Sequence, residues 1–101
     1  MQSKHTIYAL IVGAGLMALP QGAGAEDPSG AVMANTCFSC HGTDGKSAGA
    51  MPSIAGKKAD YIIKMLTEFR DGKRPSTVMK RIAKGFTDSE IAALAATFSV
   101  K

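Results

Sequence analysis

Residues 37–41 read Cys37-Phe-Ser-Cys40-His41, and a glycine follows them. Two cysteines separated by two residues, with a histidine directly after the second, form the attachment pattern of a c-type haem. On a helical turn these three side chains fall on one side, because residues three and four apart are neighbours there. Both sulfurs can then form thioethers with one porphyrin while the His41 imidazole reaches the iron. The stretch therefore predicts one covalently bound haem c, held by Cys37 and Cys40, with His41 as an iron ligand.

Two cysteines at this spacing also occur in structural disulfides, thioredoxin-like redox pairs and zinc sites. A redox pair would adjoin a strand–helix–strand pattern, and the sequence contains no convincing run of strand residues. A structural zinc site takes four ligands, whereas the sequence after residue 25 offers only Cys37, Cys40 and His41. Disulfide or thiol chemistry stays open as the alternative to haem attachment.

The first quarter of the chain differs in composition from the rest. Lys4 gives a short basic start, residues 7–19 are apolar apart from small residues, and residues 23–25 read Ala-Gly-Ala. These are the parts of a secretory signal peptide with an A-x-A cleavage site. We therefore expect a signal peptide over 1–25, cleavage after Ala25 and a periplasmic protein. An uncleaved anchor is the alternative, although the apolar run is short for a membrane span.

The remaining domain, 26–101, is small and mildly basic. Loss of Lys4 lowers the formal net charge from +4 to +3, which gives no reason to expect a nucleic-acid partner. After cleavage we expect no membrane span. A domain of this size is marginal on side-chain burial alone and commonly depends on a disulfide, a metal or a cofactor. A covalent porphyrin would supply the missing apolar core.

A glycine- and serine-rich loop is predicted over 42–56. A histidine that binds a metal commonly donates its other ring N–H to a carbonyl or a carboxylate. Pro52 lies eleven residues after His41, and its backbone carbonyl is a candidate acceptor for that proton. The alternative role for Pro52 is that of a simple turn former.

The other segments predict helices. Asp27 and Pro28 are read as the cap and first turn of a helix that runs toward the cysteines. Apolar residues at helical spacing predict a long helix over 59–71 and a shorter one over 76–84. Residues 87–90, Thr-Asp-Ser-Glu, form a capping box before a last helix. The fold class expected is all-α, in a single domain.

With these elements in place, the chain resembles the class I cytochromes c, in which short helices wrap around one haem and the first and last helices cross. Residues 37–45 (CFSCHGTDG), 51–56 (MPSIAG) and 69–86 (FRDGKRPSTVMKRIAKGF) are similar to the branch that contains cytochromes c4 and the cytochrome subunit of flavocytochrome c sulfide dehydrogenase. The last segment is most similar to the latter. Cytochromes c4 carry two haem domains, whereas this chain has one motif and would correspond to a single-haem form.

The second axial ligand is expected to be a methionine thioether, because no other histidine follows residue 25. A thioether favours the reduced iron and raises its potential. The candidates are Met33, Met51, Met65 and Met79. Met33 precedes the haem motif on the same helix, and Met65 lies in a regular apolar stripe, where methionine is commonly core. The resemblance implies Met79 as the ligand, with Met51 as the alternative.

A haem with both axial positions filled has no open site for a substrate and moves single electrons through its exposed edge. The expected function is therefore that of an exported electron-transfer cytochrome without catalytic residues of its own. The resemblance implies that it accepts electrons from an FAD-containing sulfide dehydrogenase flavoprotein. Alternatives are a freely diffusing carrier to an oxidase or reaction centre, and a haem enzyme or gas sensor with a labile sixth ligand.

Basic side chains gather in the second half of the domain. They form either a docking face that steers a redox partner or ordinary solvated charge. These residues are Lys57, Lys58, Lys64, Lys73, Arg74, Lys80, Arg81 and Lys84.

Overall fold

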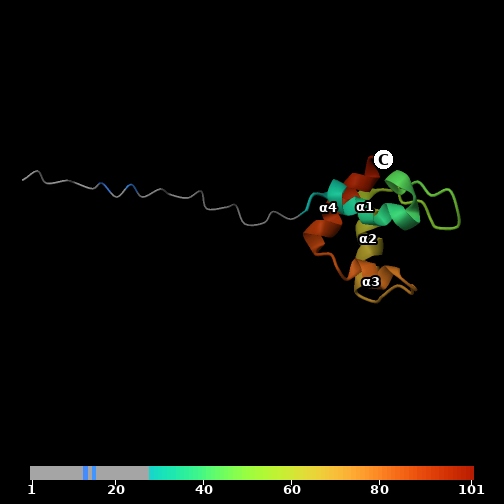
Figure 1. Ribbon diagram of the computed structural model, residues 1–101. Helices are drawn as coiled ribbons and strands as arrows, with labels where there is room; N and C mark the ends of the chain where they lie inside the picture. The colour runs from blue at the N-terminus through green and yellow to red at the C-terminus, as the bar shows by residue number, and fades with distance from the viewer. Residues whose placement is uncertain (1–12, 14, 16–27) are drawn as a thin grey trace, which may run out of the picture.

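The computed structural model describes residue 13, residue 15 and residues 28–101 (Figure 1). In chain order these residues form α1 (Gly30–His41), the 3-10 turn η1 (Thr43–Gly45), α2 (Ala59–Arg70), α3 (Met79–Ala83) and α4 (Asp88–Ser99). No strand occurs in this part of the chain, so the all-α class is confirmed. The proposed cleavage site after Ala25 lies outside the described residues.

The first and last helices cross at a glycine. Gly30 is buried where α1 meets α4, and a side chain there would overlap the Ala93 carbonyl oxygen and the Thr97 hydroxyl. The two helices contact each other and lie in the upper part of the domain in Figure 1, above α3. Phe38 of α1 packs edge-to-face on Phe98 of α4, with the ring centroids 6.1 Å apart. The crossing that the family resemblance implied is therefore present.

The core is small and comes from three helices. It contains Met33 and Ala34 of α1, Ile62 of α2, and three residues of α4, which are Leu94, Ala95 and Phe98. None of the helices in residues 28–101 is long and apolar enough to cross a bilayer.

The cap of α1 corrects one expectation from the sequence. The helix begins at Gly30, and the Ser29 hydroxyl accepts the Val32 N–H at 3.3 Å. Pro28 therefore precedes the cap and does not lie in the first turn, while Asp27 lies outside the described residues. Ser29 takes the capping role because its side-chain oxygen reaches an N–H group that the first turn leaves unpaired.

The other helix boundaries follow the sequence more closely. The capping box of α4 is confirmed, because Thr87 Oγ1 accepts the Glu90 N–H at 3.2 Å and Glu90 Oε1 accepts the Thr87 N–H at 2.9 Å. The long helix ends at Arg70, one residue before the predicted end. The shorter helix begins at Met79 and not at residue 76, because the Ser76 hydroxyl accepts the Lys80 N–H at 2.9 Å in place of a backbone carbonyl.

Candidate functional site

An apolar cavity of about 230 Å³ lies between the four α-helices and the loop that follows η1. Cys37 and His41 of α1 form part of its wall. Most of the remaining wall consists of large apolar side chains from the loop, α2, α3, α4 and the segment before α4. These are Ile54, Ile62, Leu66, Phe69, Ile82, Phe86, Leu94 and Phe98. The cavity therefore joins a thiol and an imidazole to a surface that suits a flat, apolar ligand.

His41 is held in one orientation by the loop. It is the last residue of α1 and only 7% exposed, and its Nδ1 donates to the Pro52 carbonyl at 2.6 Å. The predicted hydrogen bond is thus confirmed. Because a carbonyl can only accept, Nδ1 carries the proton, and in the neutral imidazole the lone pair is then on Nε2. This is the tautomer in which an imidazole binds a metal, with its ring oriented by the second hydrogen bond.

The two cysteines differ in their surroundings. Cys37 is half-buried on the cavity wall, whereas Cys40 is exposed one turn further along α1. Burial raises the pKa of the Cys37 thiol, and a hydrogen-bonding contact with the Thr36 hydroxyl opposes this effect. The two thiols are not joined to each other. Cys40 is not among the residues that line the cavity, although its spacing of three residues from Cys37 places it one helical turn further along the same helix.

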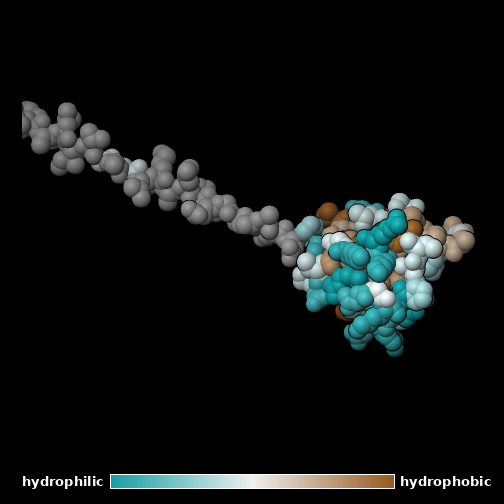
Figure 2. Space-filling view, turned by 90° about the horizontal axis from the view of Figure 1, so that it is seen from below, coloured by the Kyte–Doolittle hydropathy of each residue, from teal (hydrophilic) through white to brown (hydrophobic). Residues whose placement is uncertain are grey.

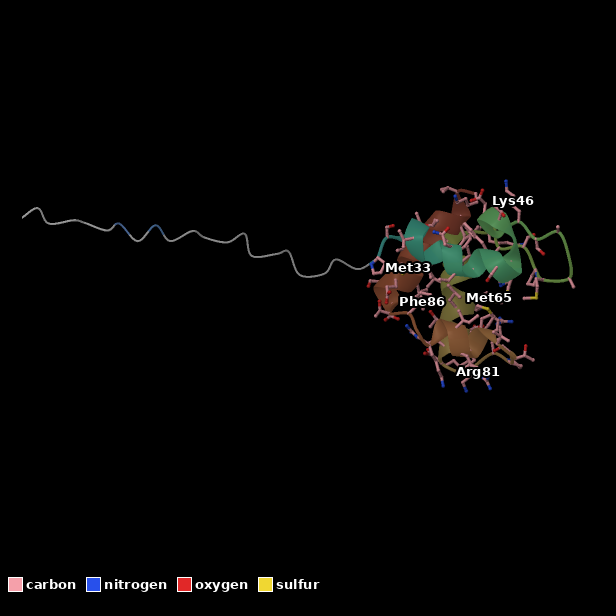
Figure 3. The ribbon with its side chains drawn as sticks, viewed as in Figure 1. Met33, Lys46, Met65, Arg81 and Phe86 are labelled. Carbon is pink, nitrogen blue, oxygen red and sulfur yellow. The ribbon has the colours of Figure 1, made fainter. Side chains whose placement is uncertain are left out.

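Two of the four methionine candidates reach the cavity. Met79, the first residue of α3, and Met65 of α2 both line it, and Figure 3 shows Met65 in the interior, beside α3. Met33 is buried in the core between α1 and α4. Met51, the alternative from the sequence, is 45% exposed and does not line the cavity. On this geometry Met65 replaces Met51 as the alternative to Met79.

The segment that leads into Met79 is tied to the end of α2. Arg74 donates from both Nε and Nη2 to Glu68 Oε2, at 2.9 and 2.7 Å. The backbone N–H groups of Lys73 and Arg74 donate to the Glu68 carbonyl at 2.9 and 3.3 Å. Glu68 therefore anchors the turn with its side chain and its backbone, and this turn places Met79 on the cavity.

These residues fit a covalently bound haem. The cavity offers apolar walls for a porphyrin, a buried imidazole with a free Nε2, two thiols one helical turn apart and two thioethers. A zinc site made by the protein alone fits less well. The described residues hold no group of three or more His, Cys, Asp or Glu side chains that could bind a metal ion.

Six of the eight basic residues fall into two groups. Lys64 and Arg74 contact Glu68, whereas Lys73, Lys80, Arg81 and Lys84 form no ion pair within residues 28–101. The latter lie on α3 and beside it, and Arg81 points away from the domain in Figure 3. Seen from this side, the surface is mostly hydrophilic (Figure 2). Lys57 lines the cavity itself.

Apolar side chains at the cavity were not recognised as surface residues from the sequence. Tyr61 of α2 is 51% exposed and Ile82 of α3 is 38% exposed, and both line the cavity. Val78, four residues before Ile82, is 52% exposed. The sequence placed Val78 and Ile82 among the apolar residues of the shorter helix, because periodicity does not show that a cavity opens beside that helix.

Comparison with known proteins agrees with this geometry. Residues 29–96 match the sequence family described as "Cytochrome c". The chain is 48% identical over 69 residues to the "Cytochrome subunit of sulfide dehydrogenase" of Chlorobaculum tepidum, over 68% of this chain and 63% of that protein. It is 42% identical over 66 residues to the "Thiosulfate dehydrogenase electron acceptor" of Stutzerimonas stutzeri, over 63% of this chain and 31% of that protein.

A solved structure of a cytochrome c is also similar to this chain. The structure of a cytochrome c4 from Acidithiobacillus ferrooxidans is similar to this chain with a TM-score of 0.62 and 43% identity. The likeness covers 64% of this chain and 38% of that one. The chain thus spans less than two thirds of the length of each of these three proteins.

Proposed function

The chain belongs to the cytochrome c family, and from this premise we propose that it is an exported protein that carries single electrons on one covalently bound haem c. The observation that carries the proposal is the placement of His41 and Cys37 on the wall of an apolar cavity, with the His41 Nδ1 proton already donated to Pro52.

The haem, when bound, supplies an iron that gains and loses one electron. Cys37 and Cys40 would hold the porphyrin through thioethers, and His41 and Met79 would bind the iron. The apolar walls of the cavity exclude water, which favours the less charged, reduced state. With both axial positions filled, the chain would offer no coordination site to a substrate, so an electron carrier is favoured over a haem enzyme or gas sensor.

The electron donor that we propose is an FAD-containing sulfide dehydrogenase subunit. The support is the 48% identity to a relative that is named as a cytochrome subunit of sulfide dehydrogenase. A freely diffusing carrier is the second candidate, because another relative is named as an electron acceptor of thiosulfate dehydrogenase. The partner would contact the half-exposed Tyr61 and Ile82 at the cavity, next to the basic side chains of α3.

We further propose that residues 1–25 are a signal peptide and that the mature protein is periplasmic. The support is the basic start, the apolar run and the Ala-Gly-Ala sequence before Glu26. Mass spectrometry of the protein from a periplasmic extract should give a chain that begins at Glu26 and carries one haem. A chain that retains residue 1 and stays with the membrane fraction would support the uncleaved anchor.

The function is tested with the purified haem-loaded protein. Extraction with acid and acetone should leave the haem on the chain, and loss of the haem would support the non-haem thiol alternative. The reduced protein should show a low-spin spectrum that resists carbon monoxide. Rapid binding of carbon monoxide would instead indicate a labile sixth ligand.

The partner is tested by stopped-flow reduction of the oxidised protein. Sulfide together with the flavoprotein should reduce the haem quickly, whereas sulfide alone should reduce it slowly. Equal rates with and without the flavoprotein would remove it as the donor. Reduction by a thiosulfate dehydrogenase in its place would favour the second candidate.

A further inference from the structure

Pro52 makes a short hydrogen bond although it lies in an exposed loop. All residues from 48 to 53 are exposed and lie in an irregular loop, yet the Pro52 carbonyl accepts the His41 Nδ1 proton at 2.6 Å. This is the shortest side-chain hydrogen bond among the described residues that does not involve an ion pair. This distance is just below the usual N–H···O range of about 2.7–3.2 Å. Something must therefore hold the carbonyl in place.

The chain after Pro52 is anchored by its backbone. The N–H groups of Ile54 and Ala55 donate to the Gly45 carbonyl at 2.9 and 3.1 Å. The Gly56 N–H donates to the Phe98 carbonyl at 2.9 Å, which ties the loop to α4. These bonds fix the chain on one side of the Pro52 carbonyl.

The chain before Pro52 has much weaker support. Residues 48–51 read Ala-Gly-Ala-Met, and all four are exposed. A side chain added at Gly49 would meet no atom within 4 Å, so the loop does not pack on the domain there. Beyond the bonds to the Gly45 carbonyl, one further hydrogen bond joins the two arms of the loop, in which the Ser47 N–H donates to the Ser53 hydroxyl at 2.9 Å.

We propose that Ser53 is a positioning residue for the haem iron, acting through Pro52 and His41. By closing the loop, its hydroxyl keeps the Pro52 carbonyl on the Nδ1 proton, and this bond makes His41 a stronger donor to the iron. A stronger donor stabilises the oxidised iron, so Ser53 lowers the reduction potential. The inference rests on His41 as an iron ligand, as proposed above.

The loop supplies a matched pair of variants. Ser53→Ala removes the acceptor that closes the loop, and Ser53→Thr restores a hydroxyl at the same position. Ser47→Ala is the control, because it removes a hydroxyl from the same loop but keeps the N–H that donates to Ser53. Within residues 28–101 the Ser47 hydroxyl itself forms hydrogen bonds only with Gly49, at 3.2 and 3.5 Å.

Two measurements on the haem-loaded protein report on His41. The first is the reduction potential, which should become more positive in Ser53→Ala, stay unchanged in Ser47→Ala and return toward the parent value in Ser53→Thr. The second is the exchange of the His41 Nδ1 proton with deuterium, followed by NMR in the reduced state. Exchange should be about twofold to tenfold faster in Ser53→Ala, the range expected for one lost neutral hydrogen bond.

Three results would overturn the proposal. One is a Ser53→Ala protein with the parent potential and exchange rate. Another is an equal shift in Ser47→Ala, which would make the effect a general property of the loop. The third is equally faster exchange of the α4 backbone amides, which would show a loss of overall stability. A parent protein without a low-spin spectrum would instead contradict the proposed iron ligands, before any variant is compared.

Discussion

Arg70 at the end of α2 and Asp88 at the start of α4 form an ion pair, with Arg70 Nη1 2.7 Å from Asp88 Oδ1. The same nitrogen donates to the Phe86 carbonyl at 3.4 Å, and Arg70 Nε lies 3.2 Å from Asp71 Oδ1. The carboxylates of Asp88 and Asp71 raise the pKa of the Arg70 guanidinium above its usual value. Arg70 thus joins α2 to α4. It also holds the backbone of Phe86, which lines the cavity.

Replacement of Arg70 by glutamine should loosen this junction. Gln cannot contact two carboxylates and a carbonyl at once, so we expect Arg70→Gln to lower the midpoint of denaturant unfolding. The loss should be larger at low salt than at high salt, because screening weakens the ion pairs in the parent protein. Arg81→Gln is the control, since Arg81 has no ion pair within residues 28–101. Equal midpoints for the two variants at low salt would contradict this role.

Replacement of Met79 by alanine should remove the thioether from the iron. The far-red absorption band of the oxidised haem, which arises from charge transfer between thioether and iron, should then be lost, and the reduction potential should fall. Met51→Ala should retain the band, because Met51 is exposed outside the cavity. Met65→Ala should also retain it. A band that is lost in Met65→Ala and kept in Met79→Ala would make Met65 the ligand.

An added methyl group at Gly30 should destabilise the crossing of α1 and α4. The new carbon would overlap the carbonyl oxygen of Ala93, which is backbone and cannot turn away. We expect Gly30→Ala to lower the free energy of unfolding by about 1–3 kcal/mol, as overpacking of a core does. Gly49→Ala provides the comparison, because its position is open, and it should be nearly neutral. A Gly30→Ala protein as stable as the parent would show that the helices can separate at little cost.

The basic side chains of α3 should steer charged redox reagents. We expect Arg81→Glu to slow oxidation of the reduced haem by ferricyanide at low salt, because a positive surface attracts this anion, and the difference should shrink as salt rises. Lys46→Glu makes the same change of charge at the opposite end of the domain (Figure 3). Its effect should be smaller. Equal effects would mean that the net charge, and not the α3 face, controls the rate.

Much of the site could be predicted from the sequence because its parts are local. The haem motif fits within one helical turn, and the capping box of α4 spans residues 87–90. The Pro52 carbonyl was also expected, since a metal-binding histidine needs a partner and the nearby loop offers one. Each of these features depends on residues that lie close together in the sequence, so the residue types and their spacing are enough to predict it.

Other features depend on contacts between side chains and backbone that composition does not reveal. Ser29 caps α1, and Ser76 delays the start of α3, although any serine near a helix end could do either. Tyr61 of α2 and Ile82 of α3 are exposed because they lie at the cavity, and the sequence does not show where that cavity is. The hydrogen bond between Ser47 and Ser53 depends on the path of the loop, which glycine and alanine residues leave open.

The crossing of α1 and α4 also sets an order of events for the newly made chain. The cysteines lie on α1, but the helix that packs beside them, α4, is synthesised after the other helices of residues 28–101, and contacts so distant in sequence form late. Once α4 is in place, Cys37 is half-buried and the pKa of its thiol is raised, so less of the reactive thiolate is present. Thioether formation is therefore expected before the ends of the domain meet, so that the porphyrin becomes a template on which the last helix folds.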